Sequence, residues 1–239
     1  MVINMKNKKW DKFGKLTEKC YENMIGAEKD GSYWEKAFEL LMEIVREERQ
    51  ENSNFALELE MLEEVTDYEY DIQGWLEDCL DEIDMRGNHR TLLQMCDALL
   101  GTFGWPEYTG SDIEFRKAAA MAQLGQKKES AEFCKKWLQK EPENIIAACA
   151  GVYAFIEVKE FEEAEKLVEH FIPDKSRCSE ENDMMFAAAS TLYQVTGRKK
   201  EKKVVDNAMK QYEEYLKEYF EMPDSDDENE EFFEGDLPF

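Results

Sequence analysis

The chain has 239 residues, of which 43% are hydrophobic and 36% are charged, and its formal net charge is −25 at pH 7. The apolar content excludes a wholly disordered chain. The acidic balance argues against direct binding of DNA or RNA, because Lys and Arg supply most of the affinity for phosphate backbones. The longest apolar run, Ile145–Ile156, is shorter than the roughly 20 residues that a membrane span needs. We therefore expect a cytoplasmic protein that binds neither nucleic acid nor a membrane directly.

The six cysteines form no CxxC or other close pair. In an intracellular helical chain, this spacing favours reduced thiols that are buried as small apolar side chains over disulfides or a metal site. We expect no metal ion and no cofactor.

In the N-terminal part, residues 1–16 are expected to form a basic extension or first helix, and a helical-repeat domain is expected over 17–222. The apolar spacing predicts helices at Lys19–Lys29 and Tyr33–Glu47. Phe55–Val65 is predicted to be an additional helix without an obvious mate. Further along, helices are predicted at Ile72–Met85 and Thr91–Leu100, and Trp105-Pro106 should end that unit.

Two central stretches, Ser111–Pro142 and Ile145–Pro173, align with each other at a shift of 34 residues. Each contains a helix, a tight turn and a second helix, and ends at a proline. The predicted helices are Asp112–Gln123, Glu129–Gln139, Ile145–Ile156 and Phe161–Phe171. A weaker copy follows at Asn182–Gly197 and Glu201–Tyr212. A fixed period in the 30s that is built from helix pairs is typical of a stacked helical solenoid.

Small residues, turn glycines and terminal prolines recur at matching places in these units. They are Leu124-Gly125, Ala131 and Pro142 in one unit and Gly151, Phe161, Ala164 and Pro173 in the next. This pattern resembles the tetratricopeptide repeat family, although Lys159 stands where that family usually has a turn glycine. The resemblance implies an all-α fold, in which helical hairpins of the tetratricopeptide type stack into a right-handed superhelical solenoid, and a role in binding rather than catalysis.

In such a solenoid the first helix of each hairpin lines the concave wall, which is the usual binding surface of the family. Helical periodicity assigns nine residues to this wall: Phe115, Ala119, Ala122, Cys149, Tyr153, Ile156, Ala187, Thr191 and Gln194. In the upstream units, the same face carries Glu22, Glu77, Asp81 and Asp84. A suitable ligand is an amphipathic or extended peptide with a basic end, held by apolar anchors. The alternative is that a shifted helix places Phe115 and Tyr153 in the core.

Residues 223–239 form an acidic tail with eight Asp or Glu and no Lys or Arg, which is expected to be disordered. Its tip, Asp236-Leu237-Pro238-Phe239, resembles the C-terminal tip of bacterial single-stranded DNA-binding proteins. That resemblance implies a second interaction motif that recruits a protein of DNA replication or repair. Alternatively, the tail only aids solubility, or it docks on the basic patch formed by Arg198, Lys199, Lys200, Lys202 and Lys203.

No P-loop, dinucleotide-binding glycine motif, HExxH or nucleophile-elbow motif occurs, and the chain has only two histidines. We therefore expect a protein that is not an enzyme and that has no catalytic residues. The preferred function is a protein–protein interaction scaffold that binds a protein or peptide partner. The alternative is an acidic mimic of DNA that inhibits a nucleic-acid-binding protein.

Overall fold

The computed structural model describes the backbone of residues 2–221 and the side chains of residues 8–220. Over these residues the fold is all-α and contains no β-strand, only one isolated bridge between Glu58 and Gly104. The all-α class predicted from the sequence is confirmed. The chain divides into two compact units, residues 1–125 (unit 1) and the residues from 126 onward (unit 2). No helix in the described range is long and apolar enough to span a bilayer.

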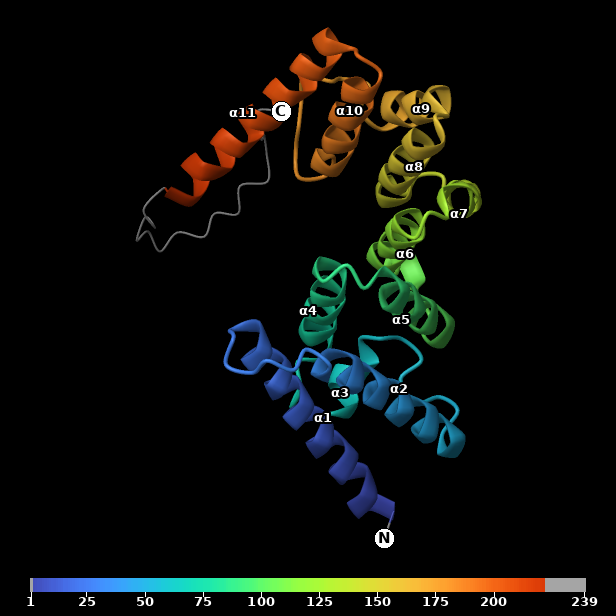
Figure 1. Ribbon diagram of the computed structural model, residues 1–239, viewed down its shortest axis with the longest axis vertical. Coiled ribbons are helices and arrows are strands. Elements are labelled where there is room, and N and C mark those ends of the chain that lie inside the picture. Colours follow the sequence, from blue (N-terminus) through green and yellow to red (C-terminus); the bar gives the residue numbers. More distant parts are fainter. Residues whose placement is uncertain (1, 222–239) are drawn as a thin grey trace, which may run out of the picture. The chain divides into compact units, whose positions relative to one another are not determined.

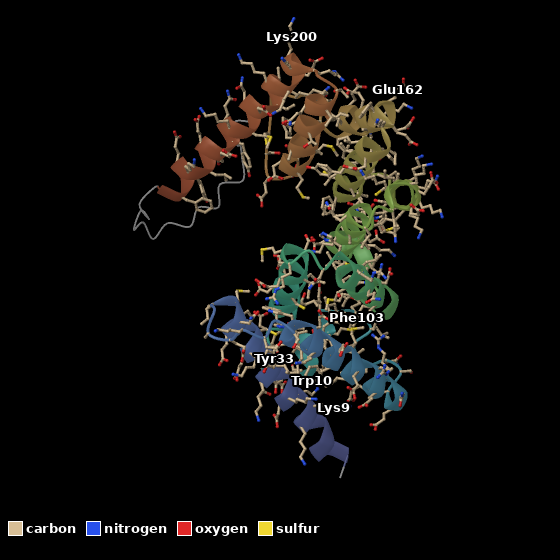
Figure 2. All side chains as sticks on the ribbon, in the orientation of Figure 1. Lys9, Trp10, Tyr33, Phe103, Glu162 and Lys200 are labelled. Carbon is tan, nitrogen blue, oxygen red and sulfur yellow. The ribbon has the colours of Figure 1, made fainter. Side chains whose placement is uncertain are left out.

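Unit 1 consists of six α-helices and one short 3-10 helix over its described residues. They are α1 (Val2–Met24), α2 (Tyr33–Glu51), α3 (Met61–Val65), α4 (Ile72–Met85), α5 (His89–Thr102), η1 (Pro106–Tyr108) and α6 (Ser111–Gln123). Helix α2 packs against α1 and α4, and α4, α5 and α6 pack in succession (Figure 1). Lys9 on α1 reaches Glu43 and Glu47 on α2 with ion pairs of 2.7 and 2.6 Å (Figure 2).

The core of unit 1 is built around aromatic side chains from three helices. Trp34 of α2 and Trp75 of α4 are both buried, and their rings stack with centroids 6.5 Å apart. Phe13 of α1 meets Trp75 edge-on at 5.0 Å. Large aromatic rings bury much apolar area and favour these stacked and edge-on geometries. This cluster therefore fixes α1, α2 and α4 against one another.

Two predicted elements in unit 1 differ from the structure. The helix expected at Lys19–Lys29 belongs to α1, which starts earlier and ends at Met24, just before the left-handed Gly26 (φ 76°). Only Met61–Val65 of the helix predicted at Phe55–Val65 is helical. The preceding turn contains Ala56 at φ 40°, and the backbone carbonyls of Phe55 and Ala56 accept hydrogen bonds from the side chain of Arg49 instead of from a helical turn.

Unit 2 contains five helices over its described residues, and their bounds mostly agree with the sequence pattern. They are α7 (Lys127–Lys140), α8 (Ile145–Val158), α9 (Phe161–Phe171), α10 (Asp183–Val195) and α11 (Lys199–Glu221). Helix α8 packs against α7, α9 and α10, and α10 also packs against α9 and α11 (Figure 1). Helix α11 continues nine residues beyond the predicted end at Tyr212, and its last turns expose Tyr215, Tyr219 and Phe220.

The turns and close contacts of the repeats explain the small residues in the sequence. Gly125 and Gly197 have φ angles of 81° and 72°, in the left-handed region that glycine adopts without a Cβ clash. Lys159, which follows α8, adopts the same conformation at φ 64°. Gly151 lies where a Cβ atom would be only 3.0 Å from a methyl group of Leu138 and of Leu167. A side chain at Gly151 would therefore require both leucine side chains to shift by a few tenths of an ångström.

Candidate functional site

The predicted binding wall in unit 2 lies on two helices that are unusually poor in charge. Helix α8 has 14 residues and one charged side chain, Glu157, and α10 has 13 residues and one, Asp183. The two helices pack side by side. Because more than a third of the whole chain is charged, such depletion on both helices marks them as elements that mostly contact apolar surroundings.

The side chains on this wall differ in how much surface they present. Tyr153, Ile156, Ala187 and Thr191 are half-buried and Gln194 is exposed, whereas Cys149 is buried. Met184 and Val195 share the α10 face with Ala187 by helical spacing, and they are 43% and 50% exposed. We call the following residues the α8–α10 face: Tyr153, Ile156, Met184, Ala187, Thr191, Gln194 and Val195.

Tyr153 and Thr191 link the two helices of this face. Burial raises the pKa of the Tyr153 phenol, while a hydrogen bond with the Thr191 side chain acts in the opposite direction. The Thr191 hydroxyl also donates to the carbonyl oxygen of Ala187 at 3.1 Å. Burial raises the pKa of the neighbouring Cys149 thiol to about 12, so this cysteine is a packed apolar side chain and not a reactive group.

The three wall residues predicted upstream belong to α6 of unit 1. Phe115 and Ala122 are half-buried and Ala119 is exposed. Of the acidic residues predicted on the upstream face, Asp81 pairs with Arg116 at 2.5 Å, and Glu22 pairs with Lys19 at 2.5 Å. Glu77 has a different environment, since it borders a pocket.

This pocket, which the sequence did not predict, lies within unit 1 and has a volume of about 330 Å³. Its lining comes from the segment before α3, from α4, from the turn after α5 and from the start of α6. The lining residues are Glu58, Leu59, Glu60, Gln73, Gly74, Leu76, Glu77, Leu80, Gly104, Trp105, Thr109, Asp112 and Ile113. We call it the acidic pocket. Its volume is at the lower end of the range of about 300–1,000 Å³ that is usual for ligand sites.

The acidic pocket combines an apolar floor with an incompletely neutralised set of carboxylates. Leu76, Leu80 and Ile113 are buried, and they make up much of the floor. Asp112 is paired with the guanidinium of Arg116 at 2.6 Å. The other carboxylates that line the pocket are those of Glu58, Glu60 and Glu77, and none of them has a cationic partner among the described side chains.

The turn that carries Trp105 into the pocket has an unusual backbone. Glu107 and Tyr108 have φ angles of 49° and 70°, which residues other than glycine rarely adopt. A Cβ atom at Gly110 would be 2.9 Å from Trp105 Cγ, so the absence of a side chain there allows the indole to pack on the start of α6. The indole N–H of Trp105 is buried and has no acceptor among the described residues.

Neither a metal-binding cluster nor a histidine lines this pocket in the described part of the chain. No group of three His, Cys, Asp or Glu there could hold a metal ion. His89 and His170 each lie 3.3 Å from a carboxylate oxygen, of Asp84 and Glu143 respectively, and neither lines the pocket.

The basic patch that the sequence suggested is partly neutralised by its own surroundings. Arg198 pairs with Glu165 and, at 3.0 Å, with Glu201, and Lys202 pairs with Asp206 at 2.6 Å. Lys199, Lys200 and Lys203 are exposed, and Figure 2 shows Lys200 projecting from the start of α11. The tail motif of Asp236, Leu237, Pro238 and Phe239 lies outside the described residues and remains a sequence-based prediction.

Comparisons with models of protein families, with curated proteins and with solved structures find no match to this chain.

Proposed function

We propose that this chain is a non-catalytic scaffold, built from helical hairpins of the tetratricopeptide type in a right-handed superhelical solenoid, that binds a protein or peptide partner. The observation that carries this proposal is the α8–α10 face, which presents apolar and small side chains without a charge in a strongly acidic chain. The hairpins α8–α9 and α10–α11, with their first helices packed together, support the same architecture.

The α8–α10 face suits an apolar segment of a partner. Met184 and Val195 are exposed at either end of the α10 face, and the small side chains of Ala187 and Thr191 lie between them. Small residues between larger apolar ones let another backbone approach, and apolar anchors supply most of the binding energy of a peptide. The partner segment is therefore expected to present two or three apolar side chains at helical or extended spacing.

A selection from a random peptide library on the purified full-length chain tests this proposal. The double variant Met184→Asp/Val195→Asp places two charges on the face, and it should weaken the selected peptides at least about tenfold, which is roughly 1.4 kcal/mol. Val204→Asp is the matched control, because Val204 is 45% exposed on α11, outside the face. The control should bind within about twofold of the wild-type chain. Selected peptides that bind both variants as tightly as the wild type would refute the proposal.

The second candidate, an acidic mimic of DNA, is favoured only by the net charge of −25. It predicts partners whose binding weakens steeply between low and high salt and which DNA displaces. Apolar binding on the α8–α10 face predicts little salt dependence and no competition by DNA. Measuring the affinity of a captured partner at two salt concentrations, with and without duplex DNA, separates the two functions.

A further inference from the structure

Three carboxylates border the acidic pocket of unit 1 without an ion pair to any side chain that the structure describes. Glu58 comes from the segment that pairs with Gly104, Glu60 lies just before α3, and Glu77 projects from α4. Like charges around one cavity repel one another. A positively charged ligand group would relieve it.

The arrangement of these carboxylates favours an organic cation over a metal ion. Although four acidic residues line the pocket, no three acidic, His or Cys groups among the described residues are close enough together to hold a metal. A metal ion needs oxygens that converge on one point. A guanidinium group instead presents five N–H donors spread over a plane, and it can satisfy carboxylates that lie on different sides of a cavity.

The rest of the lining suits the stem and surroundings of such a group. The buried side chains of Leu76, Leu80 and Ile113 provide an apolar surface for a methylene chain. Trp105 offers an indole, the aromatic ring that attracts cations most strongly and on which a planar guanidinium stacks well. The N–H of this indole is buried and has no acceptor in the described chain, so the carbonyl of a bound peptide would reach it only if the ring moved.

We infer that the acidic pocket is a binding site for a guanidinium group, either on an arginine side chain of a peptide or on a small free guanidine. The inference concerns unit 1 alone. It does not depend on peptide binding by the α8–α10 face, which belongs to unit 2.

Titration of the ¹⁵N-labelled full-length chain with the capped dipeptide Ac-Leu-Arg-NH₂ tests this inference, with the indole N–H signals followed by NMR. We expect saturable shifts, including that of Trp105, which the variant Trp105→Phe assigns. The same dipeptide with citrulline in place of arginine has nearly the same shape without the charge. It should bind at least about tenfold more weakly.

Glu77→Gln and Glu58→Gln should each weaken the arginine dipeptide at least about threefold. Glu39→Gln changes the net charge by the same amount at an exposed position of α2 that does not line the pocket, and it should leave the affinity within about twofold. Equal binding of the citrulline and arginine dipeptides would overturn the inference. So would equal weakening by Glu39→Gln and Glu77→Gln, or the absence of saturable shifts.

n-Butylguanidine, which carries the guanidinium on a four-carbon chain without a peptide group or a second charge, separates the two possible sources. Butylguanidine that binds as tightly as the dipeptide indicates a site for a free guanidine. Binding that is about tenfold weaker indicates a site for arginine within a peptide. The double variant Met184→Asp/Val195→Asp should bind the dipeptide as the wild type does, so failure of the peptide scaffold in unit 2 would not affect this result.

Discussion

The guanidinium of Arg49 donates a hydrogen bond of 2.5 Å to the carbonyl oxygen of Thr102, which lies 53 residues further along the chain. The same group donates to the carbonyl oxygens of Phe55, at 3.0 Å, and Ala56, and it lies over the ring of Phe103. One side chain therefore ties the end of α2 to the turn before α3 and to the end of α5. These two tied segments lead directly into Glu58 and Gly104 of the acidic pocket.

Replacing this arginine should destabilise unit 1 and disturb the pocket. We expect Arg49→Met to lower the free energy of unfolding by about 2–4 kcal/mol, because three backbone carbonyls lose their donor. Arg49→Lys should recover only part of the loss, since an ammonium group cannot reproduce the planar fork of donors. Urea unfolding followed by circular dichroism measures both.

Arg46→Met is the control for this prediction, because Arg46 is exposed on the same helix. Arg46→Met should change the free energy of unfolding by no more than about 0.5 kcal/mol. Equal stabilities of Arg49→Met and Arg46→Met would show that the three carbonyl contacts contribute nothing.

Replacing Lys159, the residue with a left-handed backbone after α8, by glycine should stabilise the fold. Lys159→Gly should raise the free energy of unfolding by about 0.5–1 kcal/mol, because a Cβ atom is unfavourable at a φ of 64°. Gly125→Ala should lower the free energy of unfolding by about 1 kcal/mol, because Gly125 has a φ of 81°, where alanine is strained and glycine is not. Thermal unfolding of both variants tests the pair, and a loss of stability in Lys159→Gly would contradict the backbone argument.

The N-terminus of α8 depends on a buried asparagine. Asn144 Oδ1 accepts hydrogen bonds from the backbone N–H groups of Ile146 and Ala147, and its Nδ2 donates to Glu141 at 2.7 Å. We expect Asn144→Ala to lower the free energy of unfolding, measured in urea, by about 1–2 kcal/mol. Asn88→Ala is a matched control, because Asn88 precedes α5 at the same position but its side chain caps no backbone N–H group. This variant should change the free energy of unfolding little.

Buried thiols should make the fold sensitive to alkali. Burial raises the pKa of Cys96 and Cys149 to about 12 from an ordinary value of 9.0. Above pH 9 the unfolded chain releases these protons while the folded chain keeps them, so stability should fall as the pH rises from 9 towards 12. Urea unfolding at pH 8 and pH 10 measures this loss, and Cys149→Ala should make it smaller. A stability that does not change over this range would contradict the burial of the thiols.

Thiol labelling at pH 8 gives a separate test of the same burial. Only Cys178 is partly exposed, and burial raises its pKa to about 11, which keeps most of it protonated. We expect one slow modification under native conditions and six rapid ones in denaturant. Rapid labelling of a second thiol in the folded protein would place a cysteine at the surface.

The sequence predicted most helix ends of unit 2 well because they carry local signals, such as the proline after α7 or the glycine after α10, whereas the end of α11 has no such signal and was placed nine residues too early. It did not predict the turn before α3, because that backbone is held by the side chain of Arg49, which also binds Thr102, 53 residues further along the chain. The acidic pocket was missed for the same reason. Its lining comes from separate segments, and the left-handed Glu107 that helps to place Trp105 is not a glycine. Glu77 was assigned to an acidic face, but only the structure brings it to the same cavity as Glu58.

Gly151 lets α8 pack closely against α7 and α9 because it has no Cβ atom. A methyl group at this position would require the side chains of both Leu138 and Leu167 to move by a few tenths of an ångström. Those two leucines belong to different helices, α7 and α9, so a side chain here would disturb the contacts of α8 with both of them. Any side chain larger than a methyl group at Gly151 would need a correspondingly larger rearrangement of these three helices.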